Sequence, residues 1–101
     1  MNEAKYPIKI VIHKSGDMIY FSQLDLSRIL ERALRRSTLP LYYTSGFNPH
    51  VKLSFGRAVK IGIEADEEVT LYFLERITSE QLRHQLVTEL PVGLTIQAIV
   101  E

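Results

Sequence analysis

Four arginines are the residues of this sequence whose type and spacing point most directly to a binding chemistry. A guanidinium is permanently charged and donates a rigid fork of hydrogen bonds, which suits phosphate and carboxylate groups. On a helix with 100° per residue, the four side chains fall within an arc of about 100°. The sequence therefore predicts an exposed basic ridge that binds an anionic partner, formed by Arg28, Arg32, Arg35 and Arg36.

A purely structural explanation of these arginines stays open. Glu31 stands one helical turn before Arg35, and Asp25 stands one turn before Arg28, so two of the arginines have an ion-pair partner on the helix. The like charges of Arg28 and Arg32 argue against this explanation, because such a pair disfavours an isolated helix by about 0.2–0.5 kcal/mol. Helix stability alone would not select them.

The loop that follows this helix is the second candidate site, because it combines hydroxyl, amide, imidazole and aromatic groups in a short span. Backbone N–H groups around a glycine can hold an anion, and aromatic rings can stack on a base. A lysine close by adds positive charge. The candidate binding residues of this loop are Ser45, Gly46, Phe47, Asn48, Pro49, His50 and Lys52, with Tyr42, Tyr43 and Arg57 beside them.

The alternative for this loop is a structured turn without a ligand. In that case Phe47 fills the core, as Phe55 does further along the chain. Asn48 then forms an Asx turn with Pro49, and His50 satisfies a backbone group.

Catalytic and metal chemistry are less well supported by the sequence. Asp25, His50 and Ser45 could serve as acid, base and nucleophile of a small-molecule enzyme, but their spacing does not bring them together. The histidines at positions 13, 50 and 84 lack the spacing of a metal site. Cysteine is absent, which excludes disulfides and an iron–sulfur cluster held by this chain. We expect a binding module without a cofactor of its own rather than a self-sufficient enzyme.

The charges of the chain are divided between its two parts. Residues 1–60 carry 10 Lys and Arg against 4 Asp and Glu, whereas residues 61–101 carry 2 against 8. The net charge is +0, yet such a domain can present a cationic face to an anionic partner. The alternative is that the two parts neutralise each other in the folded protein.

The elements that would position these residues follow from periodicity and capping. Apolar residues alternate in four segments, which predicts strands over 6–13, 52–63, 69–74 and 94–100. Shorter extended pieces are predicted over 18–21 and 39–43, and an acidic turn over 64–68. Helices are predicted over 22–37 and 79–90, because Ser22 with Asp25 and Thr78 with Gln81 resemble capping boxes.

The order of these elements is βαββαβ. It predicts an α+β fold of the ferredoxin-like type, with an antiparallel sheet and both helices on one face, as a single domain over residues 1–101. No apolar run reaches about 18 residues, and the first residues lack the apolar stretch of a secretory signal. We expect a cytoplasmic protein without a membrane segment.

The text KSGDMIYFSQLDLSRILERALRRSTLPLYYTSGFNPHVKLSFG, residues 14–56, resembles a bacterial family of radical-SAM-linked proteins of unknown function. The later segment LPVGL, residues 90–94, is also similar to this family. Its members more often have histidine at the position of Gln23, so a proton-transfer or metal-binding role at this position is not expected of this chain. They also tend to be about twice as long, so the chain is expected to be a short member or the first half of one.

The resemblance implies a domain fused to, or encoded beside, a radical-SAM iron–sulfur protein, and it implies no known reaction. Carried over by position, the expected site residues are Ser22, Asp25, Arg28, Arg32, Arg35, Arg36, Ser45, Gly46, Phe47, Asn48, Pro49 and His50. The leading hypothesis is an accessory domain that presents RNA or another anionic substrate to the radical-SAM partner. The alternatives are a module that docks on the radical-SAM protein itself and a small-molecule enzyme that uses Asp25 and His50.

Overall fold

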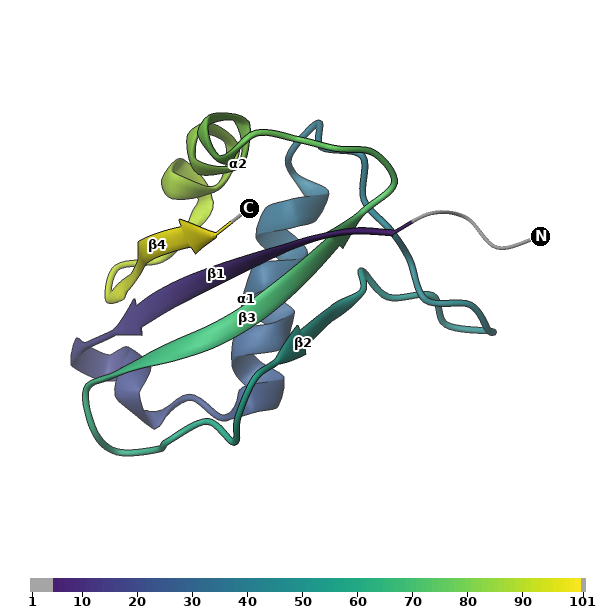
Figure 1. Ribbon diagram of the computed structural model, residues 1–101. Helices are drawn as coiled ribbons and strands as arrows, with labels where there is room; N and C mark the ends of the chain where they lie inside the picture. Colours follow the sequence, from purple (N-terminus) through teal and green to yellow (C-terminus); the bar gives the residue numbers. More distant parts are fainter. Residues whose placement is uncertain (1–4, 101) are drawn as a thin grey trace.

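The computed structural model describes residues 5–100. Its strands form one antiparallel sheet in the order β2-β3-β1-β4, and the elements follow along the chain as βαββαβ (Figure 1). The predicted α+β, ferredoxin-like arrangement is therefore confirmed. The bounds are β1 Tyr6–Lys14, α1 Gln23–Arg35, β2 Leu53–Phe55, β3 Ala65–Phe73, α2 Ser79–Leu86 and β4 Leu94–Val100, with 3₁₀ helices at Gly16–Tyr20 and Val87–Glu89.

The hydrophobic core lies on one side of the sheet, between the strands and both helices. In β1 the alternation of side chains turns Ile8, Ile10 and Ile12 inward, where they are buried. In α1 the helical period does the same for Leu26, Leu30, Ala33 and Leu34, and α2 contributes Leu82 and Leu86. Removing these side chains from water is the main force that holds the layers together.

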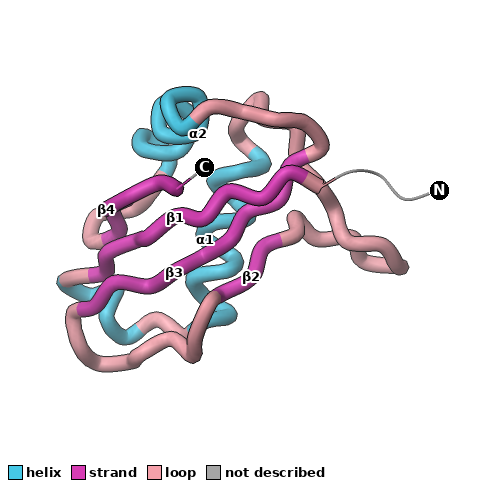
Figure 2. The backbone as a smooth tube through the Cα atoms, viewed as in Figure 1, coloured by secondary structure: helices cyan, strands magenta, loops and turns pink. Residues whose placement is uncertain are grey.

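The other side of the sheet, which we call the open face, carries no helix of the described chain (Figure 2). Side chains from β1 and β3 that point away from the core lie there, among them Lys9, His13, Thr70 and Tyr72. A β-bulge between Val11 and Ile12 shifts the pairing of β1 with β4 by one residue.

Both capping boxes are present and set the starts of the helices. The Ser22 hydroxyl accepts from the Asp25 N–H at 3.2 Å, and the Asp25 carboxylate accepts from the Ser22 N–H at 3.1 Å. The same exchange joins Thr78 and Gln81. The α-helices end at Arg35 and Leu86, earlier than predicted, and the second passes into a 3₁₀ turn.

The second predicted strand was too long. Only Leu53–Phe55 pairs with β3, because after the Gly56 N–H donates to the Glu68 carbonyl at 2.9 Å the chain leaves the sheet. Residues 57–63 instead run back to the 3₁₀ helix Gly16–Tyr20, where the Gly62 N–H donates to the Ile19 carbonyl at 2.7 Å. Ile61 and Ile63 alternate like strand residues but are 60% and 53% exposed.

The acidic turn predicted over 64–68 was also wrong, since β3 already begins at Ala65. These acidic residues belong to the strand because basic residues of β1 lie beside them: Asp66 is paired with His13, and Glu67 contacts Lys14. Likewise, the brief extension predicted over 18–21 is mostly a 3₁₀ helix, Gly16–Tyr20. No helix within residues 5–100 has the length and apolar character needed to cross a bilayer.

Candidate functional site

Residues 42–52 form a hairpin that leaves the edge of the sheet, which we call the arm (Figure 1). Its two sides are joined because the Thr44 N–H donates to the His50 carbonyl and the Lys52 N–H to the Tyr42 carbonyl, both at 2.8 Å. Tyr43 and Val51 form an isolated antiparallel bridge between them. The arm therefore has a defined base, and its tip extends beyond the sheet.

The tip of the arm is exposed from Ser45 to His50. Gly46 has a φ of 119°, a backbone angle that side chains disfavour, so this bend depends on glycine. Phe47 is wholly exposed, which contradicts the alternative that it fills the core. Asn48 and Pro49 share this exposed bend, so all six predicted binding residues from Ser45 to His50 can reach a partner.

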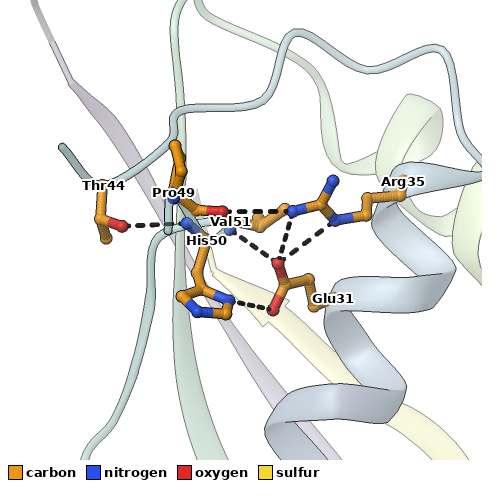
Figure 3. Close-up of polar contacts among 6 residues, drawn as sticks. All are labelled: Glu31, Arg35, Thr44, Pro49, His50 and Val51. Atoms are coloured by element: carbon orange, nitrogen blue, oxygen red, sulfur yellow. Dashed lines mark hydrogen bonds and ion pairs between the residues drawn. The ribbon is translucent and has the colours of Figure 1, made fainter. Parts of the chain in front are cut away.

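Glu31 fastens the arm to α1 (Figure 3). Its carboxylate accepts from the Arg35 guanidinium at 2.8 Å and from the Val51 backbone N–H at 3.1 Å. The second carboxylate oxygen lies 3.3 Å from Nδ1 of His50. A single side chain of the helix thus binds Arg35, one turn further along α1, and two consecutive residues of the arm.

The electrostatics of Glu31 favour its charged form. Partial burial alone would raise the pKa of this carboxyl group, but the hydrogen bonds from Arg35, the Val51 N–H and His50 outweigh it, so the pKa lies below its ordinary value. Arg35 adds a contact with the Pro49 carbonyl at 3.4 Å and lies 5.3 Å from the centre of the Tyr43 ring. The base of the arm is consequently held in one position.

A groove of about 390 Å³ runs between α1 and the arm; we call it the arm groove. Arg28 borders it from the helix, while His50 and Lys52 border it from the arm. Of the four arginines predicted to form the basic ridge, Arg28 therefore borders the same groove as the predicted loop residues His50 and Lys52. The remaining residues around it are Leu24, Ser27, Glu31, Thr44, Val51 and Leu53.

The basic ridge of four arginines is divided, which corrects the prediction of one continuous surface. Arg28 faces the arm groove and Arg35 is engaged by Glu31. Arg32 and Arg36 instead line a second groove of about 450 Å³ on the other side of α1, where Arg36 contacts Glu89 at 3.4 Å. Within residues 5–100, Arg28 and Arg32 have no hydrogen bond and no ion pair.

Ser22 and Asp25 have a structural role at the start of α1. Hydrogen bonds from the Ser22 backbone N–H and hydroxyl lower the pKa of Asp25, and the charge of Arg28 adds to the effect. Asp25 is not among the residues around the arm groove, where His50 lies, and Ser45 lies at the tip. The structure does not bring together the acid, base and nucleophile considered for an enzyme.

No three acidic or histidine side chains in the described part of the chain are arranged to hold a metal ion. The densest such group is His13 with Asp66 and Glu64. Its ring nitrogens face different carboxylates, Nδ1 at 2.6 Å from Asp66 and Nε2 at 2.7 Å from Glu64. The carboxylates bind opposite edges of the ring.

Several residues at the base of the arm were not predicted as site residues. Glu31 was expected only to pair with Arg35, whereas it also anchors the arm. Tyr72 and Lys5 were missed altogether, although the ammonium groups of Lys5 and Lys52 lie 5.9 and 5.2 Å from the centre of the Tyr72 ring. The alternation of side chains along the strand could have identified Tyr72, because Leu71 and Phe73 point inward and Tyr72 between them must point outward.

Residues 8–101 match the family described as an uncharacterized protein conserved in bacteria (DUF2344). The chain belongs to this family. The matched range contains α1, the arm and the arm groove, so the family's domain includes the whole candidate site. The expected membership of a bacterial family of unknown function is thereby confirmed. No curated protein and no solved structure matches the chain.

Proposed function

We propose that this domain binds RNA through the arm groove. The observation that carries the proposal is the convergence of Arg28, Lys52 and His50 on one groove from two separate elements. Arg28 has no ion pair within the described residues, so its guanidinium is available to a phosphate. The exposed ring of Phe47 at the tip can stack on a base.

The acidic residue in the groove does not oppose this function. Glu31 directs its carboxylate at Arg35, the Val51 N–H and His50, so its charge is compensated within the protein. Because the arm is already fixed before binding, less conformational entropy is lost when RNA binds. The groove is thus a preorganised cationic surface.

A radical-SAM iron–sulfur protein as the partner is part of the same proposal. It is supported by the resemblance of residues 14–56, and by the absence of cysteine, which assigns any cluster to another protein or domain. In this arrangement the domain holds the RNA and the partner performs the chemistry.

A second candidate function is docking on the partner protein itself. Tyr20, Ile61 and Ile63 are more than half exposed, and the Gly62 N–H bond to the Ile19 carbonyl brings their two segments together. Exposed apolar side chains that gather on one surface are typical of protein contacts. In a pull-down with the purified partner, Ile61→Lys should then weaken capture, whereas Arg28→Ala should not.

RNA binding is tested by measuring the affinity for tRNA and rRNA fragments as a function of salt. Each phosphate contact contributes about 0.7–0.9 to the salt slope, so Arg28→Ala and Lys52→Ala should each lower the slope by about that amount. Arg83→Ala is the matched control, because Arg83 is an exposed arginine on α2 outside the arm groove.

Two outcomes would contradict the proposal. Wild-type protein that fails to bind these RNAs at low salt has no such site. A slope that falls with Arg32→Ala but not with Arg28→Ala would place the phosphates in the second groove on the other side of α1.

A further inference from the structure

Two tyrosines and two lysines gather where the arm leaves the open face of the sheet. The ammonium of Lys5 lies 5.7 Å from the centre of the Tyr42 ring and 5.9 Å from that of Tyr72. The ammonium of Lys52 lies 5.2 Å from the centre of the Tyr72 ring. We call this group the Tyr–Lys patch.

The fold places the Tyr–Lys patch on a rigid part of the protein. Tyr72 is a residue of the central strand β3, opposite Pro7 of β1, and its buried neighbours Leu71 and Phe73 fix the direction of its side chain. Its hydroxyl lies 3.5 Å from that of Ser54 on β2. No helix of the described chain covers this side of the sheet, which faces the viewer in Figure 1.

The two ends of the open face differ in charge. Far from the patch, the end of β3 carries Asp66 and Glu68, and Glu64 precedes it. Near the patch the charged side chains are lysines that flank aromatic rings. At the far end Lys9, Arg57 and Lys60 lie among these carboxylates and offset part of their charge, so a negatively charged ligand is attracted mainly to the patch.

The patch is also continuous with the arm groove. Lys52 borders the groove, while its ammonium reaches the Tyr72 ring. A strand of nucleic acid that leaves the groove can therefore pass over the edge of the sheet onto the tyrosines. Aromatic rings flanked by cations suit unpaired bases joined by phosphates, because every base has a face to stack and every linkage carries a charge.

We propose that the Tyr–Lys patch is a base-stacking site for single-stranded RNA, with Tyr72 as the main stacking residue and Lys5 and Lys52 as contacts to the flanking phosphates. This inference rests on the RNA binding proposed above and specifies its substrate class. It requires unpaired bases, since bases inside a duplex cannot reach the face of a tyrosine ring.

The test compares a single-stranded oligouridine with inorganic polyphosphate, a polyanion that lacks bases. Loss of one base-stacking contact weakens affinity by about tenfold, so Tyr72→Leu should weaken oligouridine binding by that factor. The same variant should leave polyphosphate affinity and the salt slope unchanged. That unchanged polyphosphate affinity excludes a folding defect of Tyr72→Leu as the cause. Tyr72→Phe keeps the ring and should bind oligouridine as the wild type does.

Tyr20→Leu is the matched control, because Tyr20 is an exposed tyrosine of the 3₁₀ helix outside the patch. It should leave oligouridine binding unchanged. If Tyr72→Leu binds oligouridine as tightly as the wild type does, the stacking site is refuted while RNA binding in the groove stands. If the wild type binds neither ligand at low salt, the groove proposal fails as well.

Discussion

The two ends of the sheet use their charged residues in opposite ways. At the end near the 3₁₀ helix Gly16–Tyr20, basic residues of β1 meet acidic residues at the start of β3. His13 contacts Asp66 and Glu64, and Lys14 contacts Glu67. At the end near the arm, Arg28 has no ion pair within the described chain and the Lys52 ammonium lies over a tyrosine ring.

This difference refines what the division of charge along the sequence means. The suggestion that the basic and acidic parts neutralise each other holds for β1 and β3, where strand pairing brings them together. It does not hold for Arg28 and Lys52. A domain with zero net charge can therefore retain a cationic surface, because folding neutralises charges locally and not by total count.

The largest effect is expected at the buried ion pair. Lys14 is fully buried, its ammonium lies 3.2 Å from the Glu67 carboxylate, and it has no hydrogen bond within residues 5–100. Removal of the carboxylate by Glu67→Leu leaves an uncompensated buried charge and should lower the free energy of unfolding by about 3–5 kcal/mol. Urea denaturation measures this change.

The double variant Lys14→Met/Glu67→Leu removes both charges and serves as its control. It should recover most of the lost stability, since apolar replacement of a buried pair is often neutral or stabilising. If Glu67→Leu alone lowers the free energy of unfolding by less than about 1 kcal/mol, the ion pair does not determine the stability of this end of the sheet.

A smaller effect is expected where Glu31 fastens the arm. Glu31→Ala leaves the N–H of the buried residue Val51 without an acceptor and should cost about 1–3 kcal/mol of unfolding free energy. Hydrogen exchange should show faster exchange of the Val51 amide. Glu80→Ala, at an exposed position of α2, is the control and should change stability by less than about 0.5 kcal/mol. Equal effects of the two variants would refute the fastening role.

The acidic end should respond to pH through His13. Hydrogen bonds to Asp66 and then to Glu64 raise the pKa of His13, so the folded protein binds this proton more tightly than the unfolded chain. The stability gained relative to His13→Gln is therefore complete below about pH 6.5 and is lost as pH rises through the raised pKa. NMR titration of the imidazole and denaturation at several pH values measure both quantities. A His13 pKa below about 6.5 would exclude this linkage.

The smallest effect on stability is expected at the tip of the arm. Phe47 is wholly exposed, so Phe47→Ala should change the free energy of unfolding by no more than about 0.5 kcal/mol. The urea midpoint measures this change. A loss above about 1 kcal/mol would mean that the ring packs against the domain, in conflict with its exposure.

Local rules in the sequence predicted much of the fold. The capping pairs Ser22 with Asp25 and Thr78 with Gln81 located both helix starts, because each pair satisfies backbone groups within one turn. The alternation in 94–100 likewise predicted β4. Features that depend on distant partners were missed.

The length of β2 and the start of β3 are examples of such features. Ile61 and Ile63 alternate as strand residues do, yet no partner strand extends to them. Glu67 looked like part of a turn because the lysine that neutralises it lies more than fifty positions earlier. For the site, the chemistry of Arg28, His50 and Lys52 was visible in the sequence, whereas their common groove requires Glu31 to bind the Val51 N–H.

The brevity of β2 has a consequence for association between copies of this protein. An outermost strand presents unpaired backbone groups onto which another chain can add, and long flat strands are the most exposed to this. Here that border of the sheet consists of three residues of β2 and the single bridge of Leu41 to Phe73, with the arm projecting between them. Little straight backbone remains for a neighbouring molecule to extend, so the projecting hairpin also protects the protein from ordered aggregation along this side.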